Sequence, residues 1–168
     1  LEKAIESARK LDLHSLIAMS KWKIARIQDV LGEHVKSAEN FTHASEDYIK
    51  AAEKIPQLKN LFRDLATYMQ AWKEIEKAKN HHAKKQYGLA TEHYEKAAEI
   101  HKSTDRWNYL QLNYLAWARL EAAEDLSRNE QAEEARDLFQ QAASLLKEAK
   151  QSIKNQLRKI ELEEEKEM

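Results

Sequence analysis

The chain has 168 residues, which suffices for one hydrophobic core or for a short array of repeats that each bury a face against the next. The chain contains only 2 Gly and 1 Pro, whereas Ala, Leu, Glu, Lys and Gln are abundant. These residues have high helix propensity, so an all-α fold is expected. A net charge of -1 excludes a globally basic surface for nucleic acid, and 0 cysteines exclude a disulfide framework, a thiolate nucleophile and a cysteine zinc site.

The composition and the apolar runs also predict the cellular compartment of the protein. A chain without cysteine is typical of an intracellular protein. No secretory signal follows Leu1, and the longest apolar runs are far shorter than the roughly 20 residues that cross a bilayer. We therefore expect a cytoplasmic protein without membrane contact and, because the sequence opens on Leu1 rather than Met, a fragment of a longer chain.

Amphipathic helices of two kinds are predicted to alternate along the chain. Apolar residues recur every three or four positions in longer stretches that begin near residues 13, 61 and 110. Shorter, alanine-rich helices are expected at about 41–56, 87–102 and 132–149, after polar turns at Glu39-Asn40, Lys85-Gln86 and Arg128-Asn129. The last helix should continue as a cap, because Ile153, Leu157 and Ile160 extend its apolar stripe without a Gly or Pro.

The shorter helices repeat one pattern. FTHASEDYIKAAEKIP at residues 41–56 returns as YGLATEHYEKAAEIHK at 87–102, and a third copy follows, at steps of 46 and then 45 residues. An aromatic residue recurs as Tyr48, Tyr94 and Phe139, and an alanine four positions later as Ala52, Ala98 and Ala143. We expect one domain over 1–168, with a partial repeat at 1–11, repeats at about 12–56, 57–102 and 105–149, and a helical extension over 150–168.

This pattern resembles the second helix of a tetratricopeptide repeat. The first complete copy matches best, with Leu31-Gly32 in the longer helix and then Phe41, Ala44, Tyr48, Ala51 and Pro56. Two departures are clear: the period is 45–47 rather than about 34 residues, and the family's tryptophan is replaced by Gln28, Glu74 and Arg119. The resemblance implies antiparallel helix-turn-helix repeats with elongated first helices, stacked as a short right-handed superhelix. A plain antiparallel bundle or a spectrin-like coiled coil is the alternative.

The resemblance also implies a function. First helices of such arrays line a concave groove that holds a peptide, another protein or a flanking domain of the same chain. The residues that match groove positions are Arg26, Asp29, Glu33, Trp72, Ile75, Lys79, His82, Trp117, Leu120 and Glu124. Trp72 and Trp117 are equivalent and would anchor a partner in the groove, although aromatics at helical spacing also fit a core. The expected protein is a non-catalytic interaction scaffold without a cofactor.

Other chemistries receive less support from the residues. No histidine pair has the one-turn spacing of a metal site, and no phosphate loop or nucleophile elbow occurs. The basic run KAKNHHAKK at 77–85 suggests nucleic acid only weakly, because lysines at a helix C-terminus are also favourable with the helix dipole. The main alternative function is a structural bundle that self-associates, as a homo-oligomer, through Ile153, Leu157 and Ile160 of the last helix.

Overall fold

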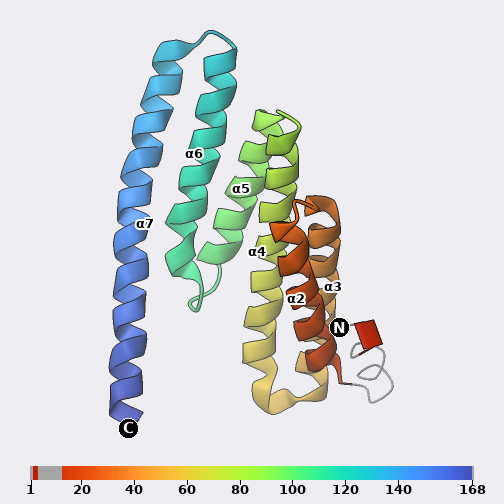
Figure 1. The fold of residues 1–168 in the computed structure, drawn as a ribbon. Coiled ribbons are helices and arrows are strands. Elements are labelled where there is room, and N and C mark those ends of the chain that lie inside the picture. The colour runs from red at the N-terminus through yellow and green to blue at the C-terminus, as the bar shows by residue number, and fades with distance from the viewer. Residues whose placement is uncertain (1, 4–12, 168) are drawn as a thin grey trace. The chain divides into compact units, whose positions relative to one another are not determined.

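The computed structural model describes residues 2–3 and 13–167, and within these residues the chain is helical and contains no strand (Figure 1). The predicted all-α class is therefore confirmed. The partial repeat expected at 1–11 lies outside the described residues, apart from Glu2 and Lys3. By contact the chain divides into two compact units, Leu1–Lys85 and Gln86–Met168, which we call unit 1 and unit 2. The boundary falls inside the repeat expected at 57–102.

Unit 1 is a group of three helices in its described part. These are α2 (His14–Val30), α3 (His34–Lys54) and α4 (Lys59–Ala83), with the short 3₁₀ helix η1 (Pro56–Leu58) before α4. Pro56 opens η1, where its fixed φ is tolerated and its missing N–H costs nothing. Helix α3 packs against both α2 and α4, so the core of the unit is built around α3.

Unit 2 contains α5 (Tyr87–Lys102), the 3₁₀ helix η2 (Asn108–Leu110), α6 (Gln111–Arg128) and α7 (Ala132–Glu167). Helix α6 packs against α5 on one side and α7 on the other. The predicted continuation of the last helix is confirmed, since α7 runs unbroken for 36 residues. The expected order of a longer helix before a shorter one holds only for α4 and α5, with 25 and 16 residues. It is wrong for α2 and α3, which have 17 and 21.

The first turn lies earlier than predicted. The expected turn at Glu39-Asn40 is wrong, because both residues lie inside α3. The chain turns instead at Gly32, which has φ +74°. The Gly32 N–H donates to Asp29 O at 2.9 Å and the Glu33 N–H to Gln28 O at 2.8 Å, the paired bonds of a Schellman motif. A residue without a Cβ adopts this conformation cheaply, so Gly32 ends α2.

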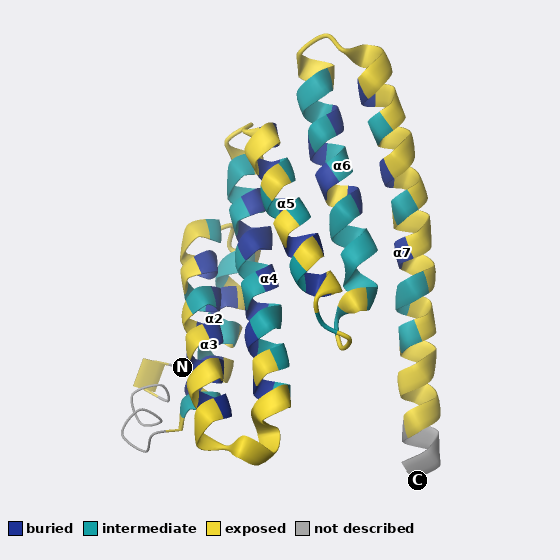
Figure 2. Ribbon diagram, turned by 180° about the vertical axis from the view of Figure 1, so that it is seen from behind, coloured by how far each residue is buried: buried dark blue, intermediate teal, exposed yellow. Residues whose placement is uncertain are grey.

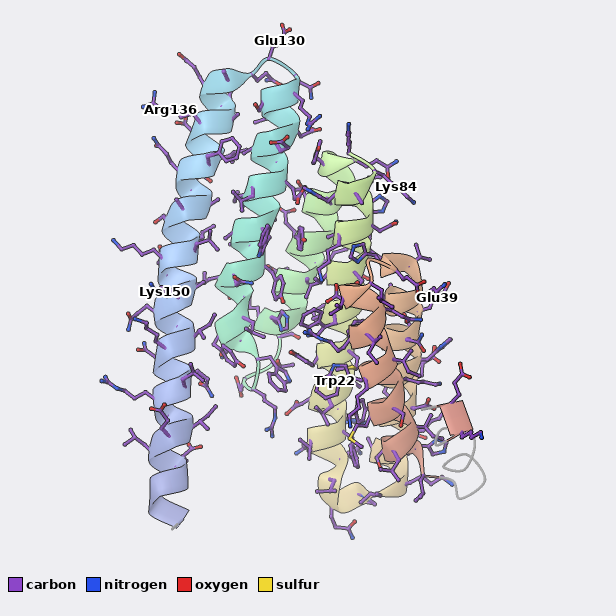
Figure 3. The ribbon with its side chains drawn as sticks, in the orientation of Figure 1. Trp22, Glu39, Lys84, Glu130, Arg136 and Lys150 are labelled. Carbon is purple, nitrogen blue, oxygen red and sulfur yellow. The ribbon has the colours of Figure 1, made fainter. Side chains whose placement is uncertain are left out.

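The other two predicted turns are confirmed. Lys85 and Glu130 have φ of 58° and 62°, and each is the second residue after the end of its helix. Glu130 lies in the turn that joins α6 and α7 (Figure 3), where the Gln131 N–H donates to Leu126 O at 3.0 Å. Both residues adopt a left-handed conformation that glycine would adopt with less strain.

Buried residues lie on the helix faces that pack together within each unit (Figure 2), and most of them are alanines and a few aromatic residues. Phe41, Tyr48 and Met69 are at most 4% exposed in unit 1. The repeat alanines Ala44, Ala51, Ala90, Ala97, Ala135 and Ala142 are also at most 2% exposed. Small side chains let neighbouring helices approach closely, and buried serines then bridge them: Ser45 Oγ donates to Ala66 O and Ser37 Oγ to Ala25 O, both at 2.9 Å. No helix of the described part has the length and apolar character needed to cross a membrane.

Candidate functional site

Four of the predicted groove residues meet where α2 and α4 of unit 1 lie together. Arg26 and Asp29 come from α2, and Trp72 and Lys79 from α4. The Trp72 ring stacks on Phe41 with 5.6 Å between ring centres. The Arg26 guanidinium lies 4.5 Å and the Lys79 ammonium 5.5 Å from the centre of the Trp72 ring. Trp72 is thus a half-buried edge of the core covered by two cations, which leaves little of its ring for a partner.

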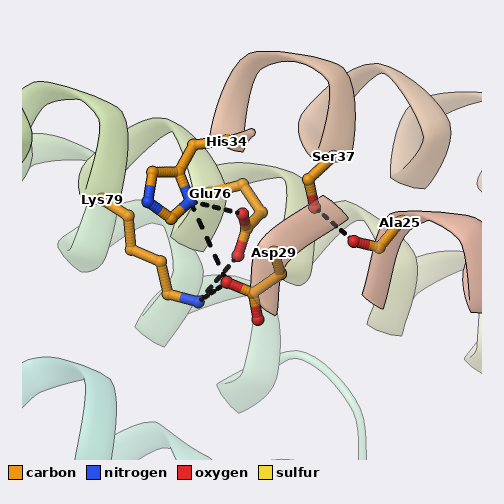
Figure 4. A network of polar contacts seen from close by, with 6 residues as sticks. All are labelled: Ala25, Asp29, His34, Ser37, Glu76 and Lys79. Carbon is orange, nitrogen blue, oxygen red and sulfur yellow. Dashed lines mark hydrogen bonds and ion pairs between the residues drawn. The ribbon is translucent and has the colours of Figure 1, made fainter. Parts of the chain in front are cut away.

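A polar network lies beside this ring and joins all three helices (Figure 4). The Lys79 ammonium donates to Asp29 Oδ1 at 2.6 Å and to Glu76 Oε1 at 2.8 Å. His34 Nδ1, at the start of α3, lies 3.0 Å from Glu76 Oε2 and 3.9 Å from Asp29 Oδ1. Glu76 is 0% exposed. A buried carboxylate requires such partners, because an unpaired charge in the interior is costly.

The charge of Asp29 is stabilised within this network. Burial by itself disfavours the charged carboxylate, but the hydrogen bond and the charge of Lys79 outweigh burial and lower the pKa of Asp29. Between α2 and α3, the pKa of Asp47 of α3 is lowered in the same way: burial opposes ionisation, and the ammonium of Lys21 of α2, 2.7 Å away, outweighs it. Both carboxyls therefore act as structural anions near neutral pH.

The same network has the spacing of a cation site. One ligand atom each from Asp29, His34 and Glu76 lie within 4.8 Å of one another, and two carboxylates with an imidazole are a ligand set that divalent metals accept. The Lys79 ammonium, however, lies in contact with both carboxylates. The cluster is therefore an ion-pair network that carries its own cation and ties α2, α3 and α4 together. The sequence gives no sign that His34 joins it, because its partners are 42 and 5 residues away on other helices.

The remaining predicted residues lie apart from this network. Ile75 is 2% exposed and packs in the core of unit 1, so it offers no surface to a partner. Glu33 accepts a hydrogen bond from Lys36 at 3.0 Å, and His82 is exposed at the end of α4. The others lie on α6 of unit 2.

In unit 2, Trp117 is 43% exposed and stacks on Tyr94 with 6.1 Å between ring centres. Leu120 is half-buried, and Glu124 accepts a hydrogen bond from Arg128 at 3.0 Å. The two equivalent tryptophans therefore differ in the structure. Trp72 is covered by charged side chains, whereas Trp117 presents part of its ring to solvent.

A surface that was not predicted lies at the turn between α2 and α3. Four aliphatic side chains are at least half exposed there: Ile27 at 53%, Val30 at 82%, Leu31 at 68% and Val35 at 52%. We call these four residues the apolar corner. Single exposed aliphatic residues are common on monomers, but a group within nine residues of chain is a candidate contact surface. Ile27 and Leu31 belong to the apolar residues that recur every three or four positions from residue 13 onward, so periodicity alone could not reveal that they are exposed.

A cavity of about 470 Å³ opens beside the apolar corner, between α3 and α4. Its lining residues are His34, Val35, Ala38, Glu39, Thr42, Lys73, Lys77 and Asn80. The Lys73 and Lys77 ammonium groups both contact Glu74 Oε1 at 3.3 Å, so one carboxylate serves two cations. The cavity thus combines aliphatic walls with ammonium and amide donors that could bind a carboxylate or a backbone carbonyl.

Two lysines of the basic run at 77–85 form ion pairs with carboxylates of unit 1. Lys77 pairs with Glu74, and Lys79 pairs with Asp29 and Glu76. Lys84 and Lys85 are exposed at the end of α4. The run therefore does not form one continuous cationic surface for phosphates.

Comparison of the chain with protein-family models, with curated proteins and with solved structures finds no match.

Proposed function

We propose that the chain is a non-catalytic protein–protein interaction module, a tetratricopeptide-like scaffold of the cytoplasm, and that unit 1 binds its partner at the apolar corner and the adjacent cavity. The observation that carries this proposal is the exposure of Ile27, Val30, Leu31 and Val35 together at one turn. Burying the exposed half of an aliphatic side chain contributes about 1 kcal/mol. Four such side chains therefore offer a few kcal/mol to a ligand that covers them.

The chemistry of the cavity specifies what kind of segment would fit. An extended or helical peptide could place aliphatic side chains on Val30, Leu31 and Val35. An acidic side chain or a free carbonyl on the same segment would receive hydrogen bonds from Lys73 and Lys77, which share one carboxylate between them. The preferred ligand is therefore an amphipathic segment with neighbouring aliphatic and acidic residues.

The charged residues at the α2–α4 junction have a different role in this proposal. Asp29, Glu76 and Lys79 pair with one another at 2.6 and 2.8 Å, and Arg26 covers Trp72. These contacts hold α2 against α4 and so keep the turn between α2 and α3 in place. They support the binding surface and do not themselves contact the ligand.

The test is affinity capture from cell extract with matched variants of the full chain. The corner variant carries Val30→Asp and Leu31→Asp. The control carries Ile49→Asp and Leu58→Asp, which replace two other exposed aliphatic residues of unit 1, at 48% and 44% exposure. We expect a protein that the wild type and the control retain and the corner variant loses, while all three show equal helicity by circular dichroism. Equal capture by both variants would argue against this surface.

A further inference from the structure

Helix α7 carries a second apolar stripe beside the face that packs on α6. Its members alternate at spacings of four and three residues, the a/d pattern of a coiled coil. They are Phe139, Ala143, Leu146, Ile153, Leu157 and Ile160, with Lys150 at the one polar position. We call these seven residues the α7 seam. Phe139, Leu146, Leu157 and Ile160 are 40%, 38%, 55% and 43% exposed, so the seam is open along its length.

The two earlier repeats show what normally covers this face. The residues equivalent to Phe139 are Tyr48 in α3 and Tyr94 in α5, which are 4% and 6% exposed. Tyr48 stacks on Phe62 of α4, and Tyr94 stacks on Tyr114 of α6. In each case the covering side chain comes from the next helix in the chain, which a short connection makes antiparallel. The repeat pattern therefore places an antiparallel helix on this face.

In the described part of unit 2, the corresponding Phe139 remains 40% exposed. Phe139 and Ala143 instead line an open groove of about 370 Å³ between α6 and α7, together with Ser127, Ala132 and Arg136. Helix α7 has 36 residues against 18 in α6, so at 1.5 Å per residue it is about twice as long. Its deeply buried residues end at Ala149, while the seam continues to Ile160.

We propose that the seam is covered by the α7 of a second copy of this chain, packed antiparallel. The seam is self-complementary in that direction, because its apolar residues lie at nearly equal distances on either side of its middle. In the register that pairs leucine with leucine, Leu146 lies against Leu157 and Ala143 against Ile160 of the other copy, so the contact covers the seam from Ala143 to Ile160. This proposal does not depend on the function proposed above, whose surface lies in unit 1.

Lys150 selects the antiparallel direction. In a parallel pair in register, each Lys150 would face the Lys150 of the other copy inside the seam, and two like charges would be desolvated together. In the antiparallel pair, Lys150 lies against Ile153, where its aliphatic stem can pack and its ammonium can reach solvent. Lys147 and Lys154 flank the same middle region. Salt, which screens the repulsion among these lysines, should therefore strengthen the dimer.

Sedimentation equilibrium of the full chain over a wide concentration range tests the contact. We expect a weak dimer, because five apolar side chains per copy form a small interface, and we expect it to tighten with salt. Leu146→Glu with Leu157→Glu should weaken association at least tenfold. The control is Gln141→Glu with Asn155→Glu, the same charge change on the opposite, exposed face of α7, and it should associate like the wild type or nearly so.

Disulfide cross-linking tests the direction, since the chain has 0 cysteines of its own. An equal mixture of L146C and L157C chains should give a cross-linked dimer that contains one of each. Either variant alone should cross-link little, because in the antiparallel pair identical positions lie 11 residues, or about 16 Å, apart along the helix. The proposal would be overturned by a chain that stays monomeric at every concentration or by association that Leu146→Glu with Leu157→Glu leaves unchanged. Efficient cross-linking of either cysteine variant with itself would also overturn it.

Discussion

At the scale of single residues, Lys85 and Glu130 are the non-glycine positions of the described chain that adopt left-handed backbone conformations. Glu130, with φ 62°, ends α6 in the way that Gly32, with φ 74°, ends α2. We expect Glu130→Gly to raise the free energy of unfolding by about 0.5 to 1 kcal/mol, because glycine relieves the Cβ strain of this conformation. Urea denaturation measures the change. Gln141→Gly, inside α7, should instead lower stability by about 1 kcal/mol, and a loss of stability in Glu130→Gly would contradict the reading of this turn.

Lys79 holds the network of unit 1 together. Its side chain is 29% exposed, and its partners Asp29 and Glu76 are 15% and 0% exposed. Lys79→Met should therefore cost about 1 to 3 kcal/mol of stability, because it leaves two poorly hydrated carboxylates without their cation. Lys77→Met, at a side chain 42% exposed, should change stability by less than about 0.5 kcal/mol. Adding Glu76→Gln to Lys79→Met should restore part of the loss. Equal losses of stability in the two lysine variants would show that the network is too well hydrated to contribute more than a surface ion pair.

His101 makes the stability of unit 2 depend on pH. It is 1% exposed and stacks on Tyr114, and burial lowers its pKa from 6.5 to about 4. Between these values the unfolded chain binds the proton and the folded chain does not, so stability falls as the pH falls from about 6.5 to 4. The full effect is up to about 3 kcal/mol, at 1.4 kcal/mol per pKa unit.

The matched experiment is urea denaturation of the wild type and His101→Gln at several pH values. Between pH 4 and 6.5, the free energy of unfolding of His101→Gln should change much less with pH than that of the wild type. The lowered pKa values of Asp29 and Asp47 should act only at lower pH, since their stabilisation is lost as the pH falls below the ordinary range of carboxyl groups. Parallel pH profiles for the two proteins would mean that His101 titrates normally in the folded chain.

At the scale of elements, the sequence pattern predicted which helix faces are buried better than where helices begin. Small residues at Ala44, Ala51, Ala90 and Ala97 marked the packed faces correctly, because only small side chains fit where helices approach closely. The polar pair Glu39-Asn40 was mistaken for a turn, although polar residues are equally at home on the exposed side of a helix. The backbone freedom of Gly32 was the stronger signal.

The length of α7 leads to a further prediction. Its residues buried below 2% exposure end at Ala149, so removing residues 156–168 should change the stability of the monomeric chain by less than about 1 kcal/mol. Removing residues 143–168 also deletes Ala149 and its contacts with the rest of unit 2, and should cost several kcal/mol. Thermal unfolding at low protein concentration distinguishes the two truncations. A large loss from the shorter truncation would place stabilising contacts on the end of α7 that the structure does not show.

At the scale of the whole molecule, the repeat predicted an all-helical chain in which each helix packs against its neighbours in the sequence. The repeat period runs through Lys85 and Gln86 without a break, so it could not indicate that contacts divide the chain there. The groove residues were chosen by sequence position alone. Position cannot reveal that Lys79 neutralises Asp29 and Glu76, nor that Val30 and Leu31 remain uncovered, because both facts depend on side chains from other helices.

We propose that unit 1 binds another protein at the apolar corner. The most direct measurement places a photoreactive amino acid at Val30 in one sample and at Ile49 in another, and irradiates each full chain in cell extract. We expect a discrete adduct with one protein from position 30 that is missing from position 49. The same adducts from both positions, or none from position 30 while the chain remains folded, would contradict it.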